Sequence, residues 1–180
     1  MTPDQRREIE EALQTSSARV CEMLETRSPE ELTHRPAPDS WSAAECVAHL
    51  ALTSKGALPA LEAVVAGLRA RGLTTDRPSR MDWLGWLLRR ALEPPPRFKT
   101  RTATPFQPLD VAPVSEVRSA FLDGQARLVR VLRDAEGLDL SRSKVTSPFD
   151  RRIRDNAYSM LRILETHERR HLWQAERALP

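Results

Sequence analysis

Apolar residues recur every three or four positions along several long stretches of the chain, which is the spacing of one face of an α-helix. The first stretch opens with Thr2, Pro3 and Gln5, which suit an N-cap, a first-turn proline and a capping-box partner. The pattern predicts a helix from there to about Thr26. Its apolar stripe consists of Ile9, Leu13, Val20 and Leu24.

A second helix is predicted to begin at Ser42, after a polar, proline-rich connection. Ser42 and Glu45 have the spacing of a capping box, and Trp41 and Cys46 have that of a hydrophobic staple. The helix is expected to end near Gly72, because glycine is favoured just beyond a helix C-terminus. Its apolar face carries Cys46, Leu50, Ala57, Leu61, Val64 and Leu68.

Three further helical stretches follow. The sequence MDWLGWLLRRALE is stopped by the prolines at 94–96, and two longer helices are predicted over 115–135 and about 155–178. No strand pattern or internal repeat competes with them. The expected fold is therefore all-α, a single domain over residues 1–180 built as a four-helix bundle with Pro-rich connecting loops.

Composition narrows the class of protein. The net charge of +3 is too small and too dispersed for a nucleic-acid-binding surface. Cys21 and Cys46 both fall in apolar helical patterns, which favours buried thiols in a reducing compartment over a disulfide. The first ten residues lack the apolar core of a signal peptide, and no apolar run is long enough to span a membrane. We expect a cytoplasmic protein with neither nucleic acid nor membrane as partner.

The last predicted helix contains the sequence HERRH, which has the H-E-x-x-H spacing of zinc metalloproteases. His167 and His171 are four residues apart, so both imidazoles can point at one ion, and Glu168 would be the protease's general base. The best-known proteases of this type take a third ligand from downstream, where only residues 172–180 remain. Their sole candidate, Glu176, has a poor reach, so a third ligand must come from earlier in the chain. A zinc protease is therefore the less favoured alternative.

The remaining histidines are His34, in the polar connection, and His49, at the border of the second helix's apolar face. His167 and His171 lie on one flank of the last helix's apolar stripe, so His49 can meet them in a seam between the two helices. Three imidazoles make an open site for zinc, nickel or iron, with positions left for water or substrate.

Other interpretations of these residues stay open. Histidines four apart beside arginine and glutamate also suit a solvated, ion-paired helix face. Glu168 points closer to the apolar stripe than either histidine, so it needs a partner, which can be an imidazole N–H, an arginine or a metal-bound water. A role in supporting the metal ligands is favoured over that of the protease's general base. His34 is expected to be a surface residue.

Two stretches resemble the DinB/YfiT-like superfamily. RPAPDSWSAAECVAHLALT is similar to the family's W-S-x-x-E-x-x-x-H-L helix start, and HERRHLWQAERAL to its terminal H-x-x-x-H. The loops TPFQP and SPF also fit. The resemblance implies a four-helix bundle of up-down-down-up topology and a metal triad of His49, His167 and His171; it does not include His34.

The resemblance also suggests a chemistry. Members of this superfamily include S-transferases that use low-molecular-weight thiols such as bacillithiol, and a mycothiol-dependent maleylpyruvate isomerase. By analogy, the metal would bind the thiol sulfur and favour its thiolate, which then attacks an electrophilic substrate. The leading hypothesis is thus a divalent-metal-dependent enzyme, either a thiol S-transferase or a thiol-dependent isomerase.

Two further features bear on the ligand. Arg97, Lys99 and Arg101, in a proline-rich crossover, would meet the carboxylates of a thiol cofactor, although ordinary solvated charge explains them as well. The tryptophans at 83, 86 and 173 motivate a different class, a non-catalytic stress-associated protein that binds a metal or an apolar ligand. Dimerisation through a helical face would be compatible with either function.

Overall fold

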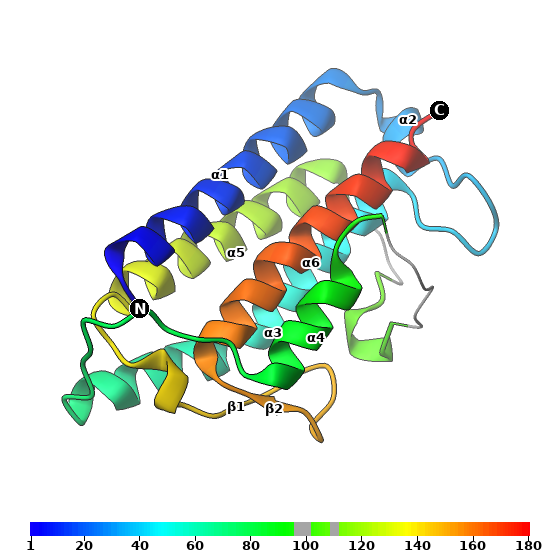
Figure 1. Ribbon diagram of the computed structural model, residues 1–180. Helices are drawn as coiled ribbons and strands as arrows, with labels where there is room; N and C mark the ends of the chain where they lie inside the picture. The colour runs from blue at the N-terminus through cyan, green and yellow to red at the C-terminus, as the bar shows by residue number, and fades with distance from the viewer. Residues whose placement is uncertain (96–101, 109–111) are drawn as a thin grey trace.

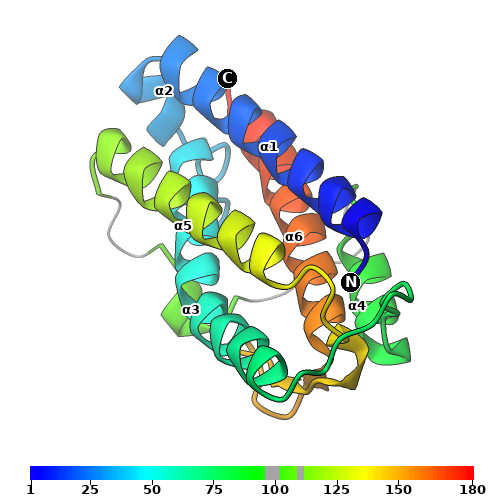
Figure 2. The ribbon, with the colours of Figure 1, turned by 90° about the vertical axis from the view of Figure 1, so that its left-hand side faces the viewer.

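Four long helices lie side by side in the computed structural model, which describes residues 1–95, 102–108 and 112–180 (Figures 1 and 2). The four helices are α1 (Pro3–Thr26), α3 (Ala43–Ala70), α5 (Val114–Asp134) and α6 (Ala157–Ala178). Both α1 and α3 pack against α5 and α6. Most of the described residues are helical, as the sequence pattern predicts.

The start of α3 is fixed by the predicted capping box. The Ser42 hydroxyl accepts from the Glu45 N–H, and the Glu45 carboxylate accepts from the Ser42 N–H at 2.8 Å. The Arg35 guanidinium donates two hydrogen bonds to the same carboxylate, with Nε 2.8 Å from Oε2. Because Glu45 is buried, these contacts fix the first turn of α3 and hence the position of His49 one turn later.

The apolar core forms two clusters. The larger one joins the four long helices and the segment 138–145, with Leu61, Leu128 and Leu164 among its members. The smaller cluster includes Leu50 and Leu172, the chain neighbours of His49 and His171. Both histidines therefore lie at the border of a packed core, which restricts their side-chain rotamers.

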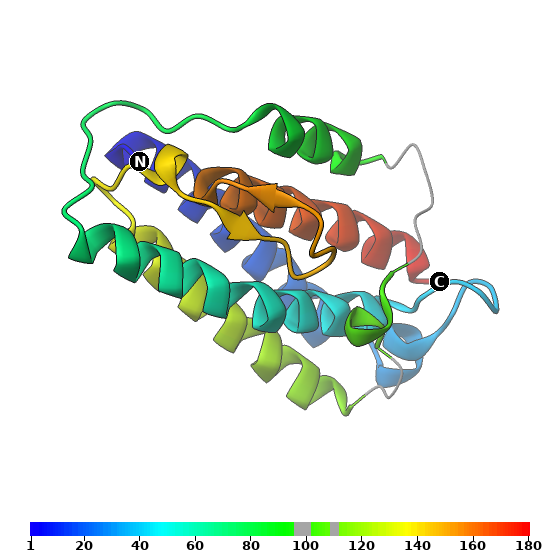
Figure 3. The same cartoon turned by 90° about the horizontal axis from the view of Figure 1, so that it is seen from below.

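Shorter elements cover the outside of the long helices. The helix α4 (Trp83–Leu92) packs on α6, which lies between α4 and α3 (Figure 3). An antiparallel pair, β1 (Val145–Thr146) and β2 (Arg154–Asp155), precedes α6. The sequence pattern did not predict this pair, because two residues are too few to show an alternation. The remaining elements are α2 (Pro29–Thr33) and the 3₁₀ turns η1 (Thr104–Phe106) and η2 (Leu140–Arg142).

None of the helices in the described residues combines the length and apolar character that a membrane crossing requires.

Candidate metal centre

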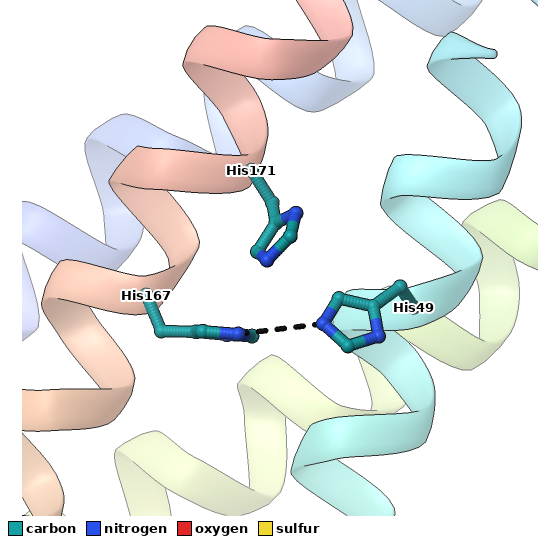
Figure 4. Close-up of side chains that lie close together, drawn as sticks. All are labelled: His49, His167 and His171. Carbon is teal, nitrogen blue, oxygen red and sulfur yellow. Dashed lines mark hydrogen bonds between the residues drawn. The ribbon is translucent and has the colours of Figure 1, made fainter. Parts of the chain in front are cut away.

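Three imidazoles face one another between α3 and α6 (Figure 4). His49 comes from α3, and His167 and His171 lie one turn apart on α6. One ring nitrogen from each residue can be chosen so that all three lie within 4.8 Å of one another. His49 Nε2 and His167 Nε2 lie 3.3 Å apart. The helix packing thus brings together the three histidines that the sequence singled out.

The orientation of His49 is set by a backbone group from another part of the chain. Its Nδ1 lies 2.6 Å from the carbonyl oxygen of Phe106, in η1. A carbonyl oxygen only accepts, so Nδ1 carries the proton and donates it, and Nε2 presents its lone pair toward the other two rings. This is the tautomer that a metal ligand bound through Nε2 requires.

Burial keeps all three rings neutral. His49 and His171 are buried, while His167 keeps part of its side chain exposed. Burial lowers the pKa of His49, against a smaller opposing effect of the Phe106 hydrogen bond. Burial, with added repulsion from His49 and Arg170, lowers the pKa of His167 to about 3. The pKa of His171 is also lowered well below its usual value, first by burial. Neutral imidazole is the form that binds metal ions.

The polar atoms of the site have unmet bonding capacity. Within the described residues, Nδ1 of His167 and Nδ1 of His171 are buried and have no hydrogen-bond partner. A hydrogen bond between the facing Nε2 atoms of His49 and His167 needs the single proton of His167 on its Nε2, because the proton of His49 is on Nδ1, and this leaves the Nδ1 of His167 as an acceptor without a donor. A divalent cation that takes one lone pair from each ring matches this donor set, because neutral nitrogen ligands suit zinc, nickel and iron.

Aromatic rings surround the imidazoles. The Trp41 ring lies 4.9 Å from that of His49, and Phe149 lies 6.1 Å from His167, measured between ring centroids. Phe149 also contacts Phe106 at 4.8 Å. Sequence reasoning did not assign Phe106 or Phe149 to the site. Their only signal was the place of each in the loops TPFQP and SPF, which were noted for their likeness to the family.

Glu168 has a partner on a third helix. The Nε2 of Gln125, on α5, donates to its Oε1 at 2.6 Å, and both side chains are buried. Burial raises the pKa of Glu168 to about 8, and the hydrogen bond from Gln125 opposes this shift. The carboxyl group therefore bonds to α5 and not to an imidazole, in contrast to the geometry that a general base at the ion would need. Gln125 was not identified from the sequence.

The other residues considered from the sequence lie elsewhere. His34 is exposed at the end of α2. Trp83 and Trp86 are 75% and 58% exposed on α4, and Trp173 packs beneath Arg177. The basic residues of the proline-rich crossover, Arg97, Lys99 and Arg101, fall outside the described residues.

Comparison with known proteins gives a family assignment. The family model of the DinB superfamily matches residues 12–175, a range that contains all three histidines and both capping-box residues of α3. No curated protein and no solved structure matched the chain. Because the matched range covers most of the sequence, the chain belongs to the DinB superfamily.

Proposed function

We propose that this protein binds one divalent metal ion through His49, His167 and His171, within a four-helix bundle of up-down-down-up connectivity. The observation that carries the proposal is the convergence of three neutral, largely buried imidazoles, with ligand atoms within 4.8 Å of one another. A solvated, ion-paired helix face would instead leave the histidines exposed and apart.

We further propose that the ion serves thiol chemistry, as a low-molecular-weight-thiol S-transferase or a thiol-dependent isomerase. A divalent ion held by three imidazoles keeps a position for a further ligand and, when bound, favours the thiolate form of a thiol. His49 and His171 hold their rings at the core border, where Trp41 packs against both, and Phe149 packs against His167. His167 is the least buried of the three residues, and we propose that a small molecule approaches the ion on its side.

Metal content tests the first proposal. Freshly purified wild-type protein is expected to hold about one zinc, nickel or iron ion per chain, and His49→Ala and His171→Ala to hold far less. His34→Ala is the matched control, since His34 is exposed and is not among the three grouped histidines. Equal metal content in all four proteins would exclude the site.

Turnover tests the second proposal. Metal-loaded wild-type protein is mixed with a low-molecular-weight thiol and a chromogenic electrophile, and the rate is compared with that of His49→Ala. Thiol-dependent conversion that the variant lacks would support a transferase. Bound metal without any conversion would contradict it.

The second candidate function is a non-catalytic one, in which the site binds a metal or an apolar ligand. The rings of Trp41, Phe106 and Phe149 favour it, because aromatic walls next to a polar group suit an apolar molecule. A zinc protease is disfavoured by the bond between Glu168 and Gln125. A homodimer, a cytoplasmic location and small-molecule partners remain predictions.

A further inference from the structure

Gly56 leaves room on α3 for the ring of Phe106. A Cβ atom added at Gly56 would lie 2.6 Å from Cε1 and 3.1 Å from Cζ of that ring. Real Cβ atoms do not approach so closely, so the ring occupies the space that any other residue would fill. Glycine in a helix interior costs about 1 kcal/mol relative to alanine, so its presence here needs a reason such as this one.

Gly56 and His49 lie on the same face of α3. They are seven residues apart, which is two helical turns. Phe106 contacts both positions: its ring packs over Gly56, and its carbonyl oxygen accepts the Nδ1 proton of His49 at 2.6 Å. One residue of η1 therefore joins a packing contact to a polar contact with the metal centre.

The ring of Phe106 is held from a second side. It is 7% exposed and packs against Phe149, whose own ring contacts His167. A ring held between Gly56 and Phe149 restricts the position of its own backbone. The strength of the hydrogen bond to His49 depends on the distance and angle that this carbonyl presents.

We propose that Phe106 is a positioning residue for the metal centre, and that Gly56 acts through it. The ring seated on Gly56 holds the carbonyl that fixes the tautomer and orientation of His49, and thereby sets metal affinity. This inference rests on the proposed metal site. It predicts that a methyl group added at Gly56, outside the triad, weakens metal binding.

Gly56→Ala and Gly67→Ala form a matched pair for the test. Both glycines are in α3, but a Cβ at Gly67 meets nothing within 4 Å. Both changes raise helix propensity equally. Cobalt(II) binding is followed by its visible absorption, and zinc affinity by competition with a chromophoric chelator. We expect Gly67→Ala to match wild type, and Gly56→Ala to bind about 10- to 100-fold more weakly, as is typical when a partner of a metal ligand is disturbed, with an altered cobalt spectrum.

The double variant separates positioning from loss of folding. In a Phe106→Ala background the ring is gone, so adding Gly56→Ala should have no further effect on cobalt affinity. Circular dichroism checks that each variant is helical. Two independent, additive losses would overturn the inference, as would wild-type affinity and spectrum in Gly56→Ala.

The result also tells the two proposals apart. If wild-type protein binds neither cobalt nor zinc, the metal site itself is refuted, and the inference with it. If wild type binds and Gly56→Ala binds equally well, only the role of Phe106 is refuted.

Discussion

At the scale of single residues, His167 and Glu168 are adjacent on α6 but face different partners. The imidazole meets His49 of α3, whereas the carboxyl group meets Gln125 of α5. The H-E-x-x-H spacing alone does not distinguish this arrangement from that of a protease.

Glu168→Gln should therefore leave the metal centre intact. Glutamine keeps an oxygen that accepts from Gln125, and it places no charge in the core. We expect zinc affinity within about threefold of wild type and a change in unfolding free energy below about 1 kcal/mol. Chelator competition and urea unfolding measure both. Loss of metal in this variant, as in His171→Ala, would mean that the carboxyl group supports the imidazoles directly.

Asp155 makes stability depend on pH. It is 1% exposed, and among the described residues no N–H or O–H donor reaches its carboxyl oxygens. Burial, and then the neighbouring carboxylate of Asp82, raise its pKa to about 6, against a smaller effect of Lys144. Between the usual carboxyl pKa and about pH 6, the folded protein therefore holds a proton that the unfolded chain lacks. This contribution to stability is lost as the pH rises through that window.

Asp155→Asn tests this linkage. The amide supplies an N–H donor toward Asp82 and carries no charge. We expect the unfolding free energy of wild type to fall by about 1–2 kcal/mol through Asp155 between about pH 5 and pH 7.5. The variant should lose less over this range and be the more stable protein at about pH 7.5. The lowered pKa of Asp82 acts only below this range. Urea unfolding at both pH values measures the difference, with exposed Asp76→Asn as control; parallel pH profiles would contradict the prediction.

At the scale of elements, two of the capping boxes pair a serine with a glutamate but lie at different depths. Ser42 and Glu45 cap α3, and Ser28 and Glu31 cap α2. Each glutamate also pairs with an arginine. The Glu45 side chain is 2% exposed and that of Glu31 is 35% exposed. The buried cap positions α3, the helix that carries His49, so loss of the cap should disturb the geometry of the proposed metal site.

The change Glu45→Gln is expected to cost about 1–3 kcal/mol, because it weakens a buried, charge-assisted pair. Glu31→Gln is the matched control and should cost at most about 0.5 kcal/mol, as surface pairs do. Thermal and urea unfolding measure both. Equal costs would show that burial of the α3 cap adds nothing.

The extent to which the sequence predicted these elements follows from the length of each signal. Long helices repeat their apolar spacing over many turns and carry capping residues, so their bounds were predicted to within a few residues. The pair β1 and β2 is too short for any periodicity. The carbonyl of Phe106 and the amide of Gln125 were not predicted either, because backbone acceptors and buried amides leave no pattern in a sequence.

At the scale of the whole molecule, the triad joins distant parts of the chain. His49 and His167 are 118 positions apart, so their meeting depends on how α3 packs against α6. The apolar periodicity indicated helix faces that permit this meeting, but only the packed core fixes it. A metal ion bound to both helices would favour the folded state over the unfolded chain.

Metal should therefore raise the thermal stability of the wild-type protein. At a free metal concentration 100-fold above Kd, the expected gain is about 2.7 kcal/mol. Melting curves with zinc and with a chelator should differ for wild type and coincide for His171→Ala. A wild-type melting temperature unaffected by zinc would contradict a folded-state site.

Trp41 gives this protein an optical probe of its own. Its indole lies 4.9 Å from His49 and 5.9 Å from His171, close enough for a paramagnetic ion such as nickel or cobalt to quench its fluorescence. Replacing the exposed Trp83 and Trp86 by phenylalanine would remove most of the background emission from the surface. Ion entry and departure would then be visible in real time, in unlabelled protein.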